Sequence, residues 1–231
     1  MGPGTIAIPC GELGRYSAFS YSMACLQYPP GTTIAMMQSL SIPRNLNMII
    51  RDALAKPETE WVWLQADDHV FEADTLHRLL EREVDVLVPL ILRRRPPFAP
   101  VLFKSERVNA DGITEYEPFA YDELPRDEGL LEVYSAGTGG MLVRRRVLEA
   151  IGDPWFEFKQ GELLSEDVDF CRKIRAAGFR IHADMEVRMG HVGNFLVWPK
   201  LDDSGWGIQF QMGEGPDGAL NAIFVKPGER E

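Results

Sequence analysis

Two carboxylates and an imidazole directly follow an apolar run in the stretch 61-WVWLQADDHVF-71. The run Trp61–Ala66 predicts a buried strand. In parallel α/β sheets ligands bind outside the carboxyl ends of the strands, where Asp67, Asp68 and His69 stand in this prediction. Such a set can bind a hard divalent cation, which in turn bridges phosphate oxygens. The alternative is that the two aspartates cap the next helix or lie in a solvated turn.

The sequence on both sides of this stretch alternates short apolar runs with amphipathic segments. The pattern and the turn residues predict strands at Thr5–Pro9, Thr32–Ser39, Trp61–Ala66 and Val84–Leu92, and helices at Tyr16–Leu26, Pro43–Ala55 and Ala73–Arg82. This order indicates an α/β fold, in which helices cover both faces of a mostly parallel sheet.

After residue 92 the rhythm changes, and the chain is rich in proline, glycine and charge as far as Arg126. Strands are predicted at Pro100–Phe103, Ile113–Pro118, Leu131–Tyr134, Met141–Val143 and Phe179–Met189, and helices at Val147–Ile151 and Glu166–Ala177. Beyond His191 there is little periodicity, so we expect a tail dominated by loops. The sequence contains no internal repeat or low-complexity linker, which favours a single domain.

The composition excludes several classes of protein. The 231 residues include 35 Asp and Glu against 24 Lys and Arg, a formal net charge of −11, with 45% hydrophobic and 26% charged residues. These are ordinary globular proportions, and the negative charge disfavours general nucleic-acid binding. Three cysteines without a C-x-x-C pair predict neither a disulfide framework nor a cysteine zinc site, and favour a cytoplasmic setting. We expect no secretion signal and no membrane span, because no apolar run approaches the ~20 residues that cross a bilayer.

A second acidic group opens the helix predicted at Glu166–Ala177. Because a helix N-terminus stabilises negative charge, Glu166 and Asp167 are either a structural cap or a catalytic pair, and we expect Asp167 to be held in its ionised form. The glycine run 137-GTGG-140 permits close backbone approach to a ligand, although such runs also make turns and bulges. His191 follows an apolar strand and is either a ligand or a buried, hydrogen-bonded histidine.

The order of these features resembles that of GT-A glycosyltransferases, in particular glycosyltransferase family 2 and related bacterial and phage nucleotide-sugar transferases. The features are a strand ending in Asp-Asp-His, a Gly-Thr-Gly-Gly-Met strand, a Ser-Glu-Asp-Val-Asp-Phe-Cys helix, Ala-Gly-Phe-Arg-Ile and a Gly-His pair. Upstream, Pro43-Arg44-Asn45-Leu46 resembles the Ala-Arg-Asn helix start that commonly precedes the third strand in these enzymes. The resemblance covers Thr5 to Gly193 and implies a Rossmann-like, mixed but mostly parallel sheet flanked by helices.

The resemblance also implies how the chain is divided and what it does. A GT-A domain is expected over residues 1–193, with a nucleotide-binding half at 1–92 and an acceptor and catalytic half at 93–193. Residues 194–231 are expected to form a loop-rich tail packed on the same domain. The implied activity is metal-dependent transfer of a sugar from a UDP- or GDP-linked donor to a hydroxyl acceptor, with Mn²⁺ or Mg²⁺ as the cofactor.

The resemblance assigns the metal site position by position. Asp68 matches the metal-binding aspartate of the D-x-D element, and His191 matches the late histidine that often completes the site. Asp67 is implied to contact the nucleotide ribose or the metal, and His69 is a further candidate ligand. The sequence departs from the pattern at Ala66, where a strict D-x-D motif has another aspartate. Which of the three residues after Ala66 contacts the cation therefore stays open.

The other site residues follow in the same way. Asp167 is implied to be the general base if the enzyme inverts, with Glu166 beside it in the catalytic pair. The candidates for donor binding are Pro9, Arg44, Asp67, Gly139 and Gly140. Trp155 is either an aromatic surface for the acceptor or a core residue. Two arginine runs, 93–95 and 144–146, either bind anions or balance nearby acids, and Arg95 is the candidate for the acceptor side.

Two other functions remain open from the sequence. A sugar nucleotidyltransferase shares the α/β core but carries a glycine-rich, basic loop directly after its first strand, which Cys10–Arg15 (CGELGR) approximates only in part. A nucleotide-sugar-binding protein with a decayed site is the non-enzymatic alternative, and Ala66 gives it some support. The joint presence of the acidic and histidine candidates speaks against decay.

Overall fold

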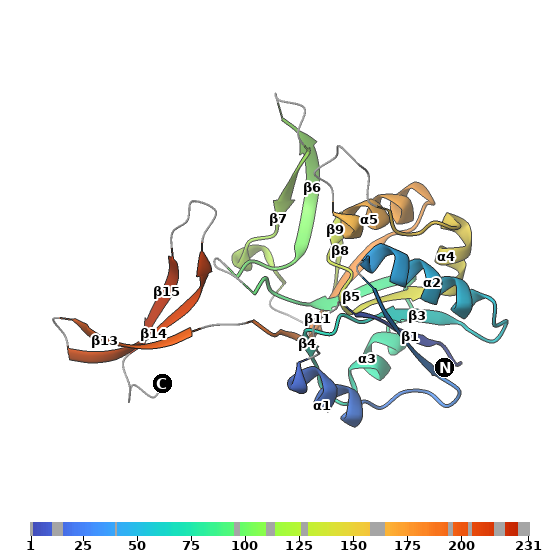
Figure 1. Cartoon of the computed structure of the whole chain (residues 1–231). Helices are drawn as coiled ribbons and strands as arrows, with labels where there is room; N and C mark the ends of the chain where they lie inside the picture. The colour runs from blue at the N-terminus through green and yellow to red at the C-terminus, as the bar shows by residue number, and fades with distance from the viewer. Residues whose placement is uncertain are drawn as a thin grey trace.

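The alternating apolar runs form a seven-stranded mixed sheet in the computed structural model (Figure 1). The structure describes residues 2–10, 16–39, 41–94, 98–109, 114–125, 129–157, 165–193, 196–202, 205–214 and 220–225. The strands of this sheet are β1 (Thr5–Cys10), β2 (Thr33–Gln38), β3 (Trp61–Leu64), β5 (Val86–Leu90), β8 (Leu130–Val133), β10 (Met141–Arg144) and β11 (Ile181–Arg188).

The strands lie in the order β2-β1-β3-β10-β5-β11-β8. The strands β1, β2, β3, β5 and β11 share one direction, whereas β10 and β8 run antiparallel to their neighbours. The predicted α/β fold with a mixed, mostly parallel sheet is thus confirmed. Each strand and helix predicted before residue 92 is present, with ends that differ by two residues or fewer.

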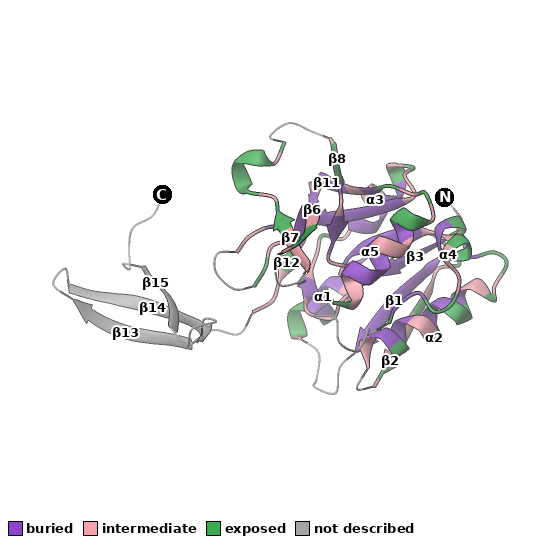
Figure 2. Cartoon of the chain, turned by 90° about the horizontal axis from the view of Figure 1, so that it is seen from above, coloured by how far each residue is buried: buried purple, intermediate pink, exposed green. Residues whose placement is uncertain are grey.

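Among the described residues, five α-helices cover the two faces of the sheet (Figures 1 and 2). They are α1 (Ser17–Cys25), α2 (Ile42–Leu54), α3 (Thr75–Glu81), α4 (Arg145–Ile151) and α5 (Glu166–Ala176). The helices α1 and α3 pack on one face, where Phe19 and Leu79 meet Trp63. The helices α2, α4 and α5 pack on the other, around Ile50 and Phe170. Both faces of β1 and β3 are therefore buried (Figure 2), which explains their continuous apolar sequence.

Two small sheets stand at the carboxyl-end edge of the main sheet. One has the order β7-β6-β9, from β6 (Leu102–Val108), β7 (Thr114–Pro118) and β9 (Ser135–Ala136), and its β6–β7 hairpin projects from the body (Figure 1). The short helix η1 (Tyr121–Glu123) follows it. The other pairs β4 (His69–Val70) with β12 (Gly190–His191). The sequence analysis did not predict this second pairing.

The prediction of a loop-dominated tail is wrong. Three antiparallel strands follow residue 195, namely β13 (Leu196–Asp202), β14 (Gly205–Glu214) and β15 (Leu220–Val225). The sequence of β14 alternates large apolar residues with glycine or glutamine from Trp206 to Gln211. That is the period of a strand, which the glycine content masked. Within the described ranges, no helix has the length and apolar character needed to cross a membrane.

Candidate functional site

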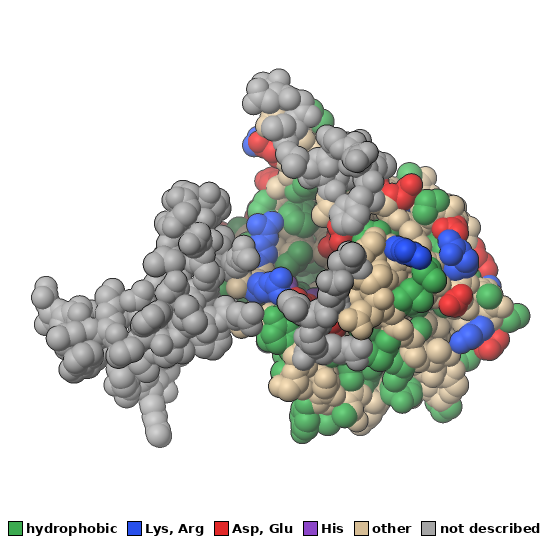
Figure 3. Space-filling view, viewed as in Figure 1, with side chains coloured by type: hydrophobic (Ala, Val, Ile, Leu, Met, Phe, Trp, Pro, Cys, Tyr) green, Lys and Arg blue, Asp and Glu red, His purple; other side chains and the backbone are tan. Residues whose placement is uncertain are grey.

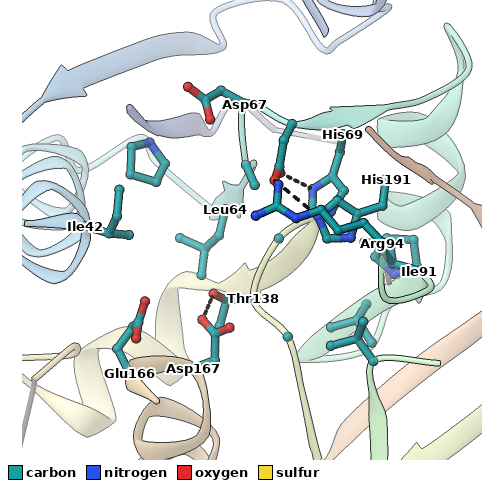
Figure 4. Close-up of a pocket in the computed structure, with 18 of the residues that line it drawn as sticks. Ile42, Leu64, Asp67, His69, Ile91, Arg94, Thr138, Glu166, Asp167 and His191 are labelled. Carbon is teal, nitrogen blue, oxygen red and sulfur yellow. Dashed lines mark hydrogen bonds and ion pairs between the residues drawn. The ribbon is translucent and has the colours of Figure 1, made fainter. Parts of the chain in front are cut away.

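A cavity of about 450 Å³ opens at the carboxyl ends of β1, β3 and β5. Figure 3 shows a hollow in this face of the molecule, with basic side chains (blue) beside it, and Figure 4 shows its lining. Eight of the predicted site residues line the cavity: Pro9, Asp67, Asp68, His69, Gly139, Glu166, Asp167 and His191. The cavity thus brings together predicted residues from segments that are far apart in the chain.

The β4–β12 pairing brings the two histidines of the site together. His69 lies opposite His191 in this antiparallel pair, and the two ring centroids are 4.6 Å apart. The Val192 amide donates to the Asp68 carbonyl oxygen at 2.8 Å, which extends the contact between the two segments. Two short strands that lie far apart in the chain therefore build a single cluster.

Asp68 is the charged centre of this cluster. Its Oδ2 atom lies 3.2 Å from Nε2 of His191 and 2.9 Å from Nη1 of Arg94. Burial opposes ionisation of Asp68, but its hydrogen bond with His191 and the electrostatic effect of the two imidazoles and Arg94 outweigh burial and lower the pKa of Asp68. The carboxylate is therefore ionised and acts as an acceptor or ligand throughout the neutral range.

His191 is oriented by a backbone carbonyl. Its Nδ1 atom lies 3.0 Å from the carbonyl oxygen of Leu92. Because a carbonyl only accepts, Nδ1 donates in this contact, and Nε2 is the ring nitrogen that faces Asp68. Histidines that bind metals are typically oriented in this way, with the second ring nitrogen donating to a carbonyl or carboxylate.

His69 is buried, and neither of its ring nitrogens has a hydrogen-bond partner among the described residues. Burial lowers its pKa to about 4, so the imidazole is neutral at pH 7. Gly139 leaves the space that this ring occupies: a Cβ atom at Gly139 would lie 2.3 Å from Cε1 of His69. A buried polar ring without a partner is costly unless something binds it.

The donor set of the cluster fits a divalent metal ion. Asp68, His69 and His191 each offer one ligand atom, and these atoms lie within 4.8 Å of one another. A carboxylate with two neutral imidazoles is a typical ligand set for a transition metal. Asp67 lines the cavity outside this cluster, and its carboxylate points away from His69 in Figure 4.

Asp167 lies on another wall of the cavity, at the start of α5 (Figure 4). Its Oδ1 atom accepts a hydrogen bond from the Thr138 hydroxyl. Burial raises the pKa of Asp167 to about 6; the Thr138 hydrogen bond opposes this rise, and the nearby Glu166 charge adds to it. The expectation that the helix N-terminus would dominate is therefore wrong in direction, because loss of solvent outweighs the dipole. A carboxyl with this pKa is still mostly ionised at pH 7 and is a stronger base than an exposed aspartate.

Three of the other predicted residues, Arg44, Gly140 and Trp155, do not line this cavity. Arg44 lines a separate groove with Arg51 and Phe156. Gly140 is a turn residue with φ of +90°, and its carbonyl oxygen accepts from Nε1 of Trp63 at 2.8 Å.

Trp155 belongs to the core. Its side chain is buried, and its indole donates to the Leu148 carbonyl oxygen at 2.8 Å, so the core alternative holds for this residue. Arg95 lies outside the described residues. Its neighbour Arg94 lines the cavity. In the second arginine run, Arg145 donates to three backbone carbonyls near the end of α2, which is a structural role.

The sequence analysis missed two polar residues of the cavity, Thr138 and Arg94. Thr138 stands inside the glycine run that was already singled out, so its position was available as a signal. Arg94 was hidden in a run of three arginines, where residue type alone does not separate one side chain from its neighbours.

Three solved structures are similar to this chain. A197 from STIV is 12% identical over 100% of this chain and 97% of its own, with a TM-score of 0.56. GalNAc-T7, solved with UDP, GalNAc and Mn²⁺, is 10% identical over 82% of this chain and 44% of its own, with a TM-score of 0.55. TarS from S. aureus is 15% identical over 83% of this chain and 37% of its own, with a TM-score of 0.50. The last two are GT-A glycosyltransferases.

The chain has the GT-A fold. This GT-A chain spans less than half of the GalNAc-T7 and TarS chains that it matches. Its sequence matches no protein-family model and no curated protein. The fold thus agrees with the resemblance drawn from the sequence motifs. Similarity at 10–15% sequence identity supports a shared fold but does not establish a shared activity.

Proposed function

We propose that this chain is a metal-dependent glycosyltransferase that moves a sugar from a nucleotide-diphosphate sugar to a hydroxyl acceptor. One observation carries the proposal: in a GT-A fold, the Asp68–His69–His191 cluster and the raised-pKa carboxyl of Asp167 line the same cavity. A metal-ligand cluster and a separate base are what transfer from a diphosphate donor requires.

Asp68, His69 and His191 would hold the cation. When bound, it supplies positive charge that offsets the charge developing on the leaving diphosphate. Two imidazole ligands favour a transition-metal ion such as Mn²⁺ over Mg²⁺, which prefers oxygen ligands. Manganese is therefore the first ion to test, and it is also the ion present in the GalNAc-T7 structure.

Asp167 would remove the proton from the acceptor hydroxyl if the enzyme inverts. The Thr138 hydroxyl donates to Oδ1 and orients the carboxylate, which lines the cavity. A pKa of about 6 keeps the group ionised at neutral pH and close to the value at which a base is most effective. Glu166 lies beside it on the cavity wall and adds negative charge that raises its basicity.

The nucleotide would lie on the wall formed by residues from the first half of the chain. Pro9, Ile42 and Leu46 offer an apolar surface there, and Asp67 offers acceptor oxygens for ribose hydroxyls. This assignment gives residues 1–92 the donor and leaves the acceptor to segments from 93 to 193. UDP is the first nucleotide to test, because GalNAc-T7 binds it on the same fold.

The experiment is a thermal-shift panel of nucleotides and nucleotide sugars, each with Mn²⁺ and with EDTA. Since a ligand that binds only the folded state raises Tm, at least one UDP- or GDP-linked compound should raise it with Mn²⁺ and not with EDTA. Asp68→Ala should abolish this shift, whereas Asp52→Ala, at an exposed position on α2, should retain it. Absence of any metal-dependent shift across the panel would overturn the proposal.

The same panel separates the two alternatives. A sugar nucleotidyltransferase would respond to a nucleoside triphosphate and release pyrophosphate when given a sugar phosphate. A decayed binding protein would show the metal-dependent shift without transfer to any acceptor. The proposal expects Asp167→Asn to keep the donor-induced shift and to lose turnover.

A further inference from the structure

Arg94 forms an ion pair with Asp68, the carboxylate that the cation would need. Its guanidinium lies 2.9 Å from Oδ2 of Asp68, the same oxygen that faces Nε2 of His191 at 3.2 Å. The side chain extends into the cavity beside both histidines (Figure 4). A monovalent cationic group thus neutralises Asp68 at the centre of the ligand cluster.

The backbone that carries Arg94 is fixed, but the side chain is not enclosed. The Arg93 amide donates to the Ala99 carbonyl oxygen at 2.9 Å and closes the base of the loop. Gly193 packs closely against Arg94, at 3.5 Å from its Cβ atom to the position of a Cβ on the glycine. The Arg94 side chain itself is 44% exposed. It can therefore leave Asp68 while its main chain stays beside the cavity.

We propose that Arg94 is a displaceable counter-ion that leaves Asp68 when the metal binds and then binds the donor diphosphate. The inference rests on the proposed function, because it assumes that Asp68 holds a cation and that the cavity receives a diphosphate. It adds a phosphate-binding residue and a coupling between metal and nucleotide.

The coupling follows from charge. Asp68 is the one carboxylate among the three ligands of the cluster, so its negative charge faces two competing cations, the metal ion and Arg94. Without nucleotide the guanidinium therefore opposes metal binding. A diphosphate supplies the missing negative charge, and a guanidinium matches two phosphate oxygens at once. When a nucleotide is bound, the same side chain therefore favours the complex of metal and diphosphate.

Arg93 provides a matched control on the same loop. Its guanidinium lies over the Phe103 ring, 5.8 Å from the centroid, and it is not part of the cavity lining. Arg93→Ala removes one positive charge at the neighbouring position, so it reports the effect of net charge alone. Comparison of Arg94→Ala with Arg93→Ala isolates the contact with Asp68.

The test is calorimetric titration of the full chain in two parts, first with Mn²⁺ alone and then with UDP at saturating Mn²⁺. Removal of a partly exposed ion pair should tighten Mn²⁺ binding of Arg94→Ala by up to about fivefold. Loss of a charge-assisted hydrogen bond should weaken its UDP binding by about tenfold or more. Arg93→Ala should match the wild type in both titrations.

Opposite changes in the two affinities support the inference, because a merely structural role for Arg94 would weaken both. If Arg94→Ala changes both affinities in the same direction, or neither, the inference is overturned while the proposed function stands. If the wild type binds no Mn²⁺, the metal site itself is wrong, and the proposed function falls with the inference.

Discussion

Replacing Asp167 by asparagine should stabilise the folded protein near neutral pH while removing turnover. The carboxyl is held in the cavity wall, where loss of solvent disfavours its charged form. Asparagine is nearly the same size, is neutral at every pH and keeps an oxygen that accepts from Thr138. The exchange therefore removes a destabilising charge and leaves the packing in place.

The magnitude follows from the pKa of Asp167, which rises from an ordinary 3.8 to about 6 on folding. Each pKa unit corresponds to about 1.36 kcal/mol, so ionised Asp167 costs the folded state about 3 kcal/mol. A raised carboxyl pKa means that the folded state binds the proton more tightly than the unfolded state does. The cost is therefore complete above pH 6, falls between pH 6 and 4, and is absent below the ordinary pKa.

The assay is urea unfolding of Asp167→Asn and the wild type at pH 7.5 and pH 4.5. The variant should gain about 3 kcal/mol at pH 7.5 and only about 1 kcal/mol at pH 4.5. Glu166→Gln serves as the control, because it removes a charge from the same end of α5. A gain that is independent of pH, or that Glu166→Gln shares in full, would refute the burial argument.

Three further predictions follow from the contacts of the site and its support. Gly139→Ala should weaken Mn²⁺ binding by about tenfold or more, because the new methyl group would overlap the His69 ring, and calorimetry that shows wild-type affinity would contradict this. Thr138→Val removes the hydrogen bond that lowers the pKa of Asp167, so the acid limb of the pH–rate profile should move upward from about pH 6, and an unchanged limb would count against Asp167 as the base. Arg145→Ala leaves three backbone carbonyls near the end of α2 without their donor and should cost about 1–3 kcal/mol in urea unfolding, whereas Arg146→Ala removes an exposed ion pair with Asp85 and should cost under about 1 kcal/mol. Equal losses in these two variants would argue against the structural role of Arg145.

Local pattern was sufficient for the elements that build the site. Strand and helix periodicity predicted β1, β3, α2 and α5 within two residues of their ends. Because polar residues after parallel strands meet at one edge of the sheet, Asp68 and His191 could be expected near one another, whereas Asp167 was added to the site by the resemblance to GT-A enzymes. The structure places all three around one cavity.

Properties that depend on tertiary structure were not available from local pattern. The pairing of β4 with β12, which sets His69 against His191, joins two-residue strands with no periodicity of their own. The pKa of Asp167 follows burial, whereas its place at a helix start indicated the opposite direction.

The sequence also could not show which of several neighbouring residues contacts the site. One arginine of the run 93–95 contacts Asp68, and another lies over an aromatic ring. From the sequence, Trp155 was either an acceptor-binding residue or a core residue. Its burial and its hydrogen bond to the Leu148 carbonyl oxygen show that it is a core residue. Residue type fixes what a side chain can do, and the fold fixes what it touches.

The most direct measurement of the central claim is an anomalous difference map from crystals grown with Mn²⁺ and UDP, recorded at the manganese absorption edge. The account predicts one strong peak bounded by a carboxylate oxygen of Asp68, a ring nitrogen of His69 and Nε2 of His191, with the UDP phosphates beside it. A peak at other residues, or UDP bound in this cavity without any peak, would contradict the account.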